Sequence, residues 1–142
     1  MDFDYITVND YARFIDDTHY MPDLDVLEGD GALITDIRLN FGRSPDVPIL
    51  RLSYRDAIAY ATWSGFRLPT ADELQQHFSD LANAMQPTKW QFYCWTCTEV
   101  AGKIVVLNGP YFFQKEIIRE RRMTVSSDYI NDFEPIALRL CR

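Results

Sequence analysis

Cysteines are few in this sequence, and a long apolar run is absent. The three cysteines are Cys94, Cys97 and Cys141. An odd number of cysteines, in a chain that opens without a basic or apolar leader, favours reduced thiols in the cytoplasm over a disulfide framework. No apolar run approaches the roughly 20 residues that a membrane-spanning helix needs. We therefore expect a cytoplasmic protein with no membrane segment.

Basic residues are also scarce: the chain has 14 Lys and Arg against 21 Asp and Glu, which gives a net charge of -7. The acids concentrate in residues 1–30, which hold nine acids and one base. A phosphate backbone is bound by clustered cations, so nucleic acid is not an expected partner. The one basic cluster contains Lys115, Arg119, Arg121 and Arg122. We interpret it first as a solvated loop or edge strand, since sheet edges are often charged.

Several motifs that indicate catalysis or metal binding are missing. The sequence contains no GxxxxGKS/T, GxGxxG, GxSxG or HExxH pattern. His19 and His77 are isolated from each other, and a Ser–His–Asp arrangement stays open. The alternating acids within residues 23–30 favour a solvated loop over a calcium site, because the EF-hand spacing is not met.

A CxxC motif is present as Cys94-Trp95-Thr96-Cys97. Redox pairs of this kind sit at helix N-termini, where the helix dipole lowers the thiol pKa, whereas this motif lies in a β-prone aromatic run. A structural zinc site needs two further ligands at suitable spacing. We therefore favour buried structural cysteines over a redox or metal site, and we expect no cofactor and no bound metal.

Hydrophobic residues make up 47% of the 142 residues, which suits one domain spanning residues 1–142. Three capping boxes predict three helices, because in each box two side chains satisfy free backbone N–H groups. The boxes pair Thr7 with Asp10, Ser53 with Asp56, and Thr70 with Glu73. Gly65 is expected to end the second helix. An apolar stripe indicates the core-facing side of the third helix: Leu74, Phe78, Leu81 and Met85.

Strand signals are concentrated in the last third of the chain. Residues 90–98 are aromatic and β-prone, residues 104–107 are apolar between two glycines, and residues 136–142 alternate apolar with other side chains. Chain-breaking residues fill the segment 19–48, where a short strand at residues 32–39 is the regular element expected. Helices followed by strands predict an α+β fold class.

A specific resemblance is carried by residues 48–73, PILRLSYRDAIAYATWSGFRLPTADE. This stretch resembles the core motif of the formylglycine-generating enzyme family, also called the sulfatase-modifying factors, and Arg67 to Glu73 is its most specific part. Weaker matches occur in the family's order at residues 6–15, 18–20, 94–96, 105–109 and 138–142. The resemblance implies a C-type-lectin-like fold of the formylglycine-generating-enzyme type, with helices packed on a twisted, mostly antiparallel sheet.

Departures from the family pattern bear on function. The oxidising members carry two closely spaced cysteines after an RGGS segment, and these bind copper and take the substrate cysteine. Residues 108–135 of this chain contain no cysteine, and Cys94 and Cys97 come too early to be that pair. The family's RGGSW segment is replaced by residues 107–111, LNGPY, in which Pro110 lacks a backbone donor. We therefore transfer no catalytic residue and no metal ligand, and we favour a protein that is not an enzyme.

The favoured interpretation is a non-catalytic binding module for a protein partner, by analogy with other uses of the fold. One alternative is a divergent oxidoreductase of the family, including part of a sulfoxide-synthase-like assembly. Another is a small acidic inhibitor protein from a mobile element. A homodimer also stays open.

Candidate binding residues lie in the segment 108–134. Aromatic and Arg side chains are enriched at interface hot spots, and this segment contains Tyr111, Phe112, Arg119, Arg121, Arg122 and Tyr129. The opposing interpretation, which we favour, places Phe112, Phe113 and Phe133 in the core. In that interpretation the arginines balance the acidic N-terminal helix. Arg67, Thr70 and Glu73 are expected to be structural, with Arg67 paired to buried acceptors.

We predict that protein purified without chelator holds no stoichiometric copper, iron or zinc, because the cysteine pair of the oxidising members is missing. Elemental analysis measures this directly. One equivalent of metal that is lost in Cys94→Ser and Cys97→Ser variants would contradict this interpretation of the CxxC motif.

Overall fold

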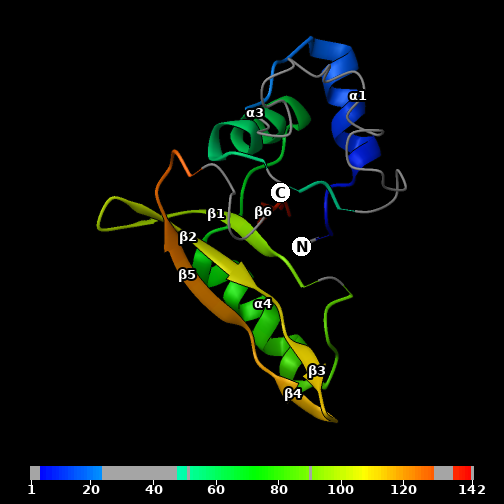
Figure 1. The fold of residues 1–142 in the computed structure, drawn as a ribbon, viewed down its shortest axis with the longest axis vertical. Coiled ribbons are helices and arrows are strands. Elements are labelled where there is room, and N and C mark those ends of the chain that lie inside the picture. The colour runs from blue at the N-terminus through cyan, green and yellow to red at the C-terminus, as the bar shows by residue number, and fades with distance from the viewer. Residues whose placement is uncertain (1–3, 24–47, 51, 90, 130–135, 142) are drawn as a thin grey trace.

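The computed structural model describes residues 4–23, 48–50, 52–89, 91–129 and 136–141. These residues form three helices and six strands, so the fold class is α+β, as predicted (Figure 1). The helices are α1 (Val8–Thr18), α3 (Tyr54–Ser64) and α4 (Ala71–Asn83). The strands are β1 (Tyr93–Val100), β2 (Lys103–Asn108), β3 (Tyr111–Phe113), β4 (Glu116–Ile118), β5 (Arg121–Val125) and β6 (Ile136–Ala137). The strand expected at residues 32–39 lies outside the described residues.

Each helix begins at the capping box that the sequence predicted. Thr7 Oγ1 accepts from the Asp10 N–H at 3.1 Å, and Asp10 Oδ2 accepts from the Thr7 N–H at 3.0 Å. Ser53–Asp56 and Thr70–Glu73 form the same reciprocal pairs at the starts of α3 and α4. Each cap stabilises its helix by about 1 kcal/mol. Gly65, with φ 79°, ends α3 as predicted. Within the described ranges, no helix has the length and apolar character needed to cross a membrane.

A four-stranded sheet in the order β5-β2-β1-β6 separates two groups of buried side chains. β2 pairs antiparallel with β1 and β5, and β6 runs parallel to β1. Ile104 and Val106 face the core shared with α1 and α3, whereas Val105 and Leu107 face the core shared with α4. β2 is therefore covered on both faces, which explains its unbroken apolar run.

The apolar stripe of α4 is shorter than predicted. Leu74 and Phe78 are fully buried and Leu81 is half-buried, but Met85 is 52% exposed. α4 ends at Asn83, and Met85 takes a left-handed backbone conformation, with φ 57°, beyond the helix. The helical period does not reach Met85, so the prediction that it belongs to the core is wrong.

The C-terminal strand is also shorter than predicted. β6 has two residues, after which Arg139 and Cys141 form single bridges to Tyr5 and Arg67. All of residues 136–141 are buried, although apolar residues alternate with other side chains along this stretch. Different segments cover the two sides of this stretch, and neither side faces water.

The β1–β2 turn offers a stabilising substitution. Ala101 and Gly102 both take left-handed backbone conformations, with φ 52° and 78°, and Asn adopts this region more readily than Ala does. We predict that Ala101→Asn raises the free energy of unfolding by about 0.5 kcal/mol, measured by urea unfolding. Gly102→Ala, the matched change at the next position, should lower it. A less stable Ala101→Asn variant would contradict this turn geometry.

Candidate functional site

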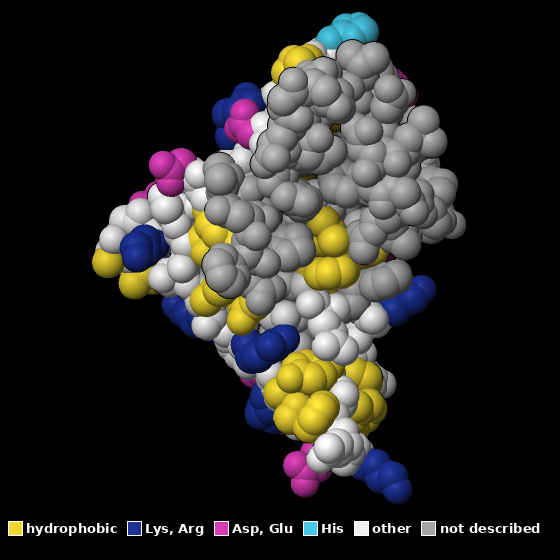
Figure 2. Space-filling view, in the orientation of Figure 1, with side chains coloured by type: hydrophobic (Ala, Val, Ile, Leu, Met, Phe, Trp, Pro, Cys, Tyr) yellow, Lys and Arg dark blue, Asp and Glu magenta, His cyan; other side chains and the backbone are white. Residues whose placement is uncertain are grey.

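The hairpin of β3 and β4 projects beyond the four-stranded sheet, at the lower end of Figure 1. Phe112 lies opposite Ile117, and Phe113 lies opposite Glu116. Phe112 is 46% exposed and Phe113 is 56% exposed. The prediction that both belong to the core is wrong, because they lie on a separate two-stranded sheet at the end of the molecule. Phe133 lies outside the described residues. Figure 2 shows apolar side chains gathered at this end.

The tip of the hairpin has a strained backbone. Gln114 and Lys115 take left-handed conformations, with φ 51° and 70°. This region costs a residue with a Cβ atom about 1 kcal/mol or more, and turns that need it are normally built from Asn and Gly. The same left-handed pair occurs at Ala101 and Gly102 in the β1–β2 turn, so it is the conformation that a two-residue hairpin turn requires.

Arg119 and Arg121 are anchored beside the hairpin. Arg119 Nη1 donates to Asn83 Oδ1 at 3.1 Å, and Arg121 Cζ lies 5.0 Å from the centroid of the Tyr111 ring. Side chains alternate along a strand, so Arg121 and Arg122 point to opposite faces of β5. All three arginines are exposed. These contacts of Arg119 and Arg121 are made with α4 and β3 rather than with α1.

Tyr129 lies apart from the hairpin. It is half-buried and packs against the core that the sheet shares with α1 and α3. The structure thus places four predicted binding residues on or next to the hairpin. The four are Tyr111, Phe112, Arg119 and Arg121. Strand alternation puts Tyr111 and Phe112 on opposite faces of β3, just as it puts Arg121 and Arg122 on opposite faces of β5, and Tyr129 lies apart from all of them.

The most specific sequence motif forms a structural clamp at the start of α4. Arg67 Nη1 and Nη2 donate to Glu73 Oε1 and Oε2, each at 2.7 Å. Glu73 Oε1 also accepts from the Thr70 N–H at 2.9 Å, so one carboxylate serves both the ion pair and the cap. Arg67 was expected to pair with buried acceptors. The Glu73 carboxylate is half-buried, and Arg67 Nη1 also donates to the carbonyl oxygen of the buried Leu68 at 3.3 Å. The backbone of Arg67 exchanges hydrogen bonds with Cys141, which fastens the C-terminal segment to this motif.

The cysteines and histidines do not form a shared site. All three thiols are free: Cys94 is buried, as predicted, Cys97 is exposed, contrary to prediction, and Cys141 is buried. Cys94 is buried in the core shared with α4, whereas Cys97 is exposed, and the register of β1 shifts between Trp95 and Glu99. Burial raises the pKa of the Cys94 thiol, which keeps it protonated. His19 is exposed at the end of α1, and His77 is on α4. Across the described ranges, no three potential ligands are grouped for a metal ion, so this donor set does not fit copper.

Asp56 is the centre of a hydrogen-bond network, although the sequence predicted it only as part of the capping box of α3. The fully buried Asp56 carboxylate accepts from the Tyr20 hydroxyl and from the Asp23 N–H, both at 2.9 Å. Burial raises the pKa of Asp56. Asp23 is itself paired with Arg55 at 2.7 Å, and the rest of the acidic segment 23–30 lies outside the described residues. No sequence pattern links positions 20, 23 and 56, so this network could not be predicted.

Comparison with protein families identifies the first part of the chain. The model of the "Sulfatase-modifying factor enzyme 1-like domain" matches residues 1–84. This region includes the specific motif from Arg67 to Glu73, so the family resemblance is confirmed. The hairpin lies beyond the matched region.

Two curated relatives are formylglycine-generating enzymes. The protein from Bos taurus is 44% identical over 57 residues, which cover 34% of this chain and 15% of the relative. The protein from Thermomonospora curvata is 48% identical over 46 residues, which cover 32% of this chain and 13% of the relative. The chain thus spans a small part of each relative's length. No solved structure matches the chain.

The pair formed by Arg67 and Glu73 makes stability depend on pH. Hydrogen bonds from Arg67 and from the Thr70 N–H lower the pKa of Glu73 from 4.5 to about 2. A folded-state pKa below the unfolded value gives a contribution that is present above pH 4.5 and lost as the pH falls towards 2. We predict that Glu73→Gln lowers the free energy of unfolding at pH 7 and flattens its fall over this acidic range, measured by urea unfolding.

Asp72→Asn is the matched control, because Asp72 lies in the same first turn of α4. This variant should keep the acid dependence of the wild type. If Glu73→Gln and the wild type lose stability equally on acidification, the paired carboxylate is not the source of the effect.

Proposed function

The chain belongs to the sulfatase-modifying factor family, and within that family we propose that it is a non-catalytic binding module with a C-type-lectin-like fold. The module binds an acidic protein partner through the β3–β4 hairpin. The observation that carries this proposal is that Phe112 and Phe113 are exposed on the hairpin, while the exposed cations Lys115, Arg119 and Arg121 lie in its turn and on the chain that leaves it.

The residues needed for the family's oxidative chemistry are not assembled in the described part of the chain. Residues 108–135 contain no cysteine. Cys94 is buried towards α4 and Cys97 is exposed on β1, so they do not provide a cysteine pair in one site. The formylglycine-generating activity in the names of the relatives belongs to proteins of which this chain covers a small part. These facts favour binding over catalysis.

The charge of the hairpin region differs from that of the chain. The whole chain has a net charge of -7, yet cations predominate on the exposed surface around the hairpin. Glu120 is turned towards α4, where its Oε2 accepts from Gln75 at 2.7 Å and from Ser79 at 2.8 Å. Arg119 Nε lies 3.6 Å from Glu120 Oε1, so part of its charge is offset, and Glu116 is an exposed acid of the hairpin. Residues 115–122 still hold four bases against these two acids. Complementary charge steers association, so the expected partner surface is acidic.

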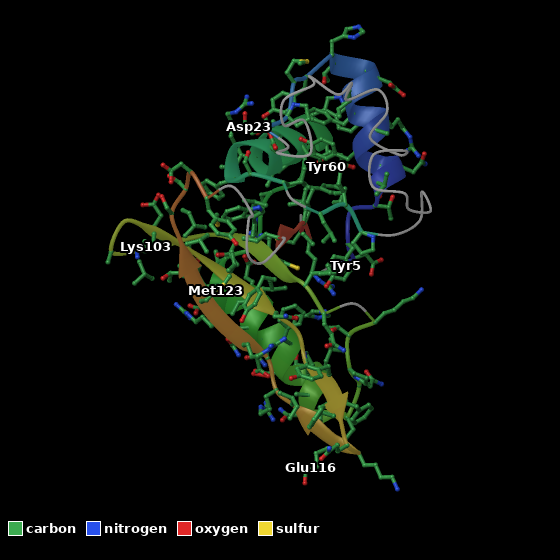
Figure 3. The ribbon with its side chains drawn as sticks, viewed as in Figure 1. Tyr5, Asp23, Tyr60, Lys103, Glu116 and Met123 are labelled. Carbon is green, nitrogen blue, oxygen red and sulfur yellow. The ribbon has the colours of Figure 1, made fainter. Side chains whose placement is uncertain are left out.

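The aromatic residues supply the apolar contact area of the proposed interface. Large rings bury much apolar area with few rotatable bonds, and Arg offers directional donors, which is why both are enriched at hot spots. The hairpin tip is accessible: Figure 3 shows Glu116 at the far end of the molecule, distant from Asp23 and Tyr60. A partner can therefore reach Phe112 and Phe113 without displacing the core.

We predict that replacing Arg119, Arg121 and Arg122 together by Ser weakens partner binding more than tenfold while the melting temperature changes little, because exposed substitutions usually alter stability by less than about 0.5 kcal/mol each. Phe112→Ser with Phe113→Ser should weaken binding similarly. The measurement is quantitative capture of a single partner from native extract, repeated at rising salt and followed by binding to the purified partner.

Phe66→Ser is the matched control, because Phe66 is an exposed phenylalanine on the link after α3. It should retain binding. If the arginine variant melts several degrees lower and still binds, these arginines serve the fold and the proposal fails. If sedimentation shows that the hairpin holds two copies of this chain together, a homodimer replaces the proposed acidic partner.

A further inference from the structure

β5 forms one edge of the four-stranded sheet, and it follows the proposed binding hairpin in the chain. All of its residues pair with β2 on one side. Figure 1 shows β5 along the outer side of the sheet, with β4 beyond its lower end. Figure 3 marks Met123 on this strand and Glu116 on the hairpin below it. Only Arg119 and Glu120 separate β4 from β5, so a partner seated on the hairpin lies next to the outer side of β5.

The turn between β1 and β2 fixes the direction of the backbone groups along β2. Val100 and Lys103 are paired across this two-residue turn. Residues that flank such a turn exchange both of their backbone hydrogen bonds, so Lys103 directs its N–H and C=O towards β1. These groups alternate along a strand. Ile104 therefore directs its own N–H and C=O towards β5.

The same alternation shows which groups of β5 point away from the sheet. Ile104 is paired with Val125, so the backbone of Val125 faces β2. Thr124 and Arg122 then turn their N–H and C=O groups outward. Within the described ranges, these outward groups make no hydrogen bond. An edge of this kind can pair with another strand.

The side chains of β5 select the kind of strand that fits this edge. Arg121 and Arg122 are exposed, and neither makes a hydrogen bond or ion pair with the part of the chain that the structure describes. The contact of Arg121 with the Tyr111 ring, 5.0 Å from Cζ to the ring centroid, leaves its N–H donors available. Like charges on neighbouring strands are destabilising. A second copy of β5 is therefore disfavoured at this edge, and an acidic strand is favoured.

We propose that β5 binds an extended acidic segment of the partner as an additional antiparallel strand of the sheet. This inference rests on the proposed function, because the segment belongs to the acidic partner that the hairpin binds. Directly opposite side chains share a face of the sheet. Acidic residues are therefore expected opposite Arg121 and Arg122, and an apolar residue opposite the half-buried Met123. The backbone bonds supply affinity and the side chains supply specificity.

The test uses a synthetic peptide that holds the sequence Thr-Val-Glu-Glu between flanking serines. In antiparallel order, these four residues lie opposite Thr124, Met123, Arg122 and Arg121. The peptide is titrated into the isotope-labelled full chain and followed by NMR at constant ionic strength. We expect saturable binding, with shifts at the N–H groups of Arg122 and Thr124.

Two methylated forms of the peptide separate strand pairing from charge attraction. The backbone nitrogens of its Thr and first Glu face β5 in the proposed register, and methylating both should weaken the affinity about tenfold, because two hydrogen bonds are lost. The nitrogens of its Val and second Glu point away, so methylating these should change the affinity less than about twofold. Equal affinities of the two methylated forms, or no saturable binding of the unmethylated peptide, would overturn the proposal.

Thr124→Pro tests the same bonds from the side of the chain. Proline removes the outward N–H and leaves the bonds to β2, which the neighbouring residues make, and proline is tolerated on edge strands. We expect binding of the peptide to weaken about tenfold, with a melting temperature near that of the wild type. Unchanged binding in a folded Thr124→Pro variant contradicts the proposal. If the variant does not fold, the two methylated peptides still decide.

This inference and the proposed function fail separately. If the peptide does not bind, but Phe112→Ser with Phe113→Ser still weakens capture of the partner, the hairpin is the binding surface and β5 is not. If the peptide binds as expected and the phenylalanine variant captures the partner fully, the hairpin proposal fails and the edge of β5 stands. A dimer in sedimentation that Thr124→Pro abolishes would assign the edge to a second copy and end the proposal of an acidic strand.

Discussion

The burial of the C-terminal segment, residues 136–141, is the constraint on which the arrangement of the helices and the sheet depends. A buried backbone must find partners for its polar groups, and this segment finds them on three different elements. It pairs parallel with β1, accepts from the Ile6 N–H through Leu138 O, and exchanges two hydrogen bonds with Arg67 through Cys141. The start of α1, the link between α3 and α4, and the sheet are thereby fixed to one another. The same segment places Arg139 over the Tyr5 ring, with Cζ 3.9 Å from the ring centroid.

The parts of the fold that could be predicted are those set by local chemistry. A capping box lies within four residues, so Thr7, Ser53 and Thr70 indicate their helices without any knowledge of the rest of the chain. The strand at residues 104–107 was predicted for a similar reason, since a short apolar run between two glycines is typical of a buried strand. The motif from Arg67 to Glu73 is also local. Its ion pair and its helix cap join residues that are close in sequence, so the motif can be recognised without knowledge of the rest of the fold.

The predictions that failed depended on which distant segment covers a side chain. Met85 continues the helical period, but the helix stops before it. Phe112 and Phe113 are large apolar residues of the kind that is usually buried, yet they are exposed on a hairpin beyond the main sheet. Cys97 is exposed although its neighbours on β1 are covered. The contact of Arg139 with Tyr5 and Phe78 could not be predicted at all, because the three residues come from distant segments and share no motif.

The departure from the family's RGGSW segment has a structural reason of its own. Gly109 is required by close packing: a methyl group at that position would collide with the side chain of Thr88 and come within 3.1 Å of Phe78 Cε1. Pro110 offers no N–H, but its carbonyl oxygen accepts both hydrogen bonds from Thr88. The base of the hairpin is therefore fastened to the loop after α4. These contacts differ from the family's RGGSW pattern, and they lie beyond residue 84, where the family match ends. The function of this chain need not be that of the longer relatives.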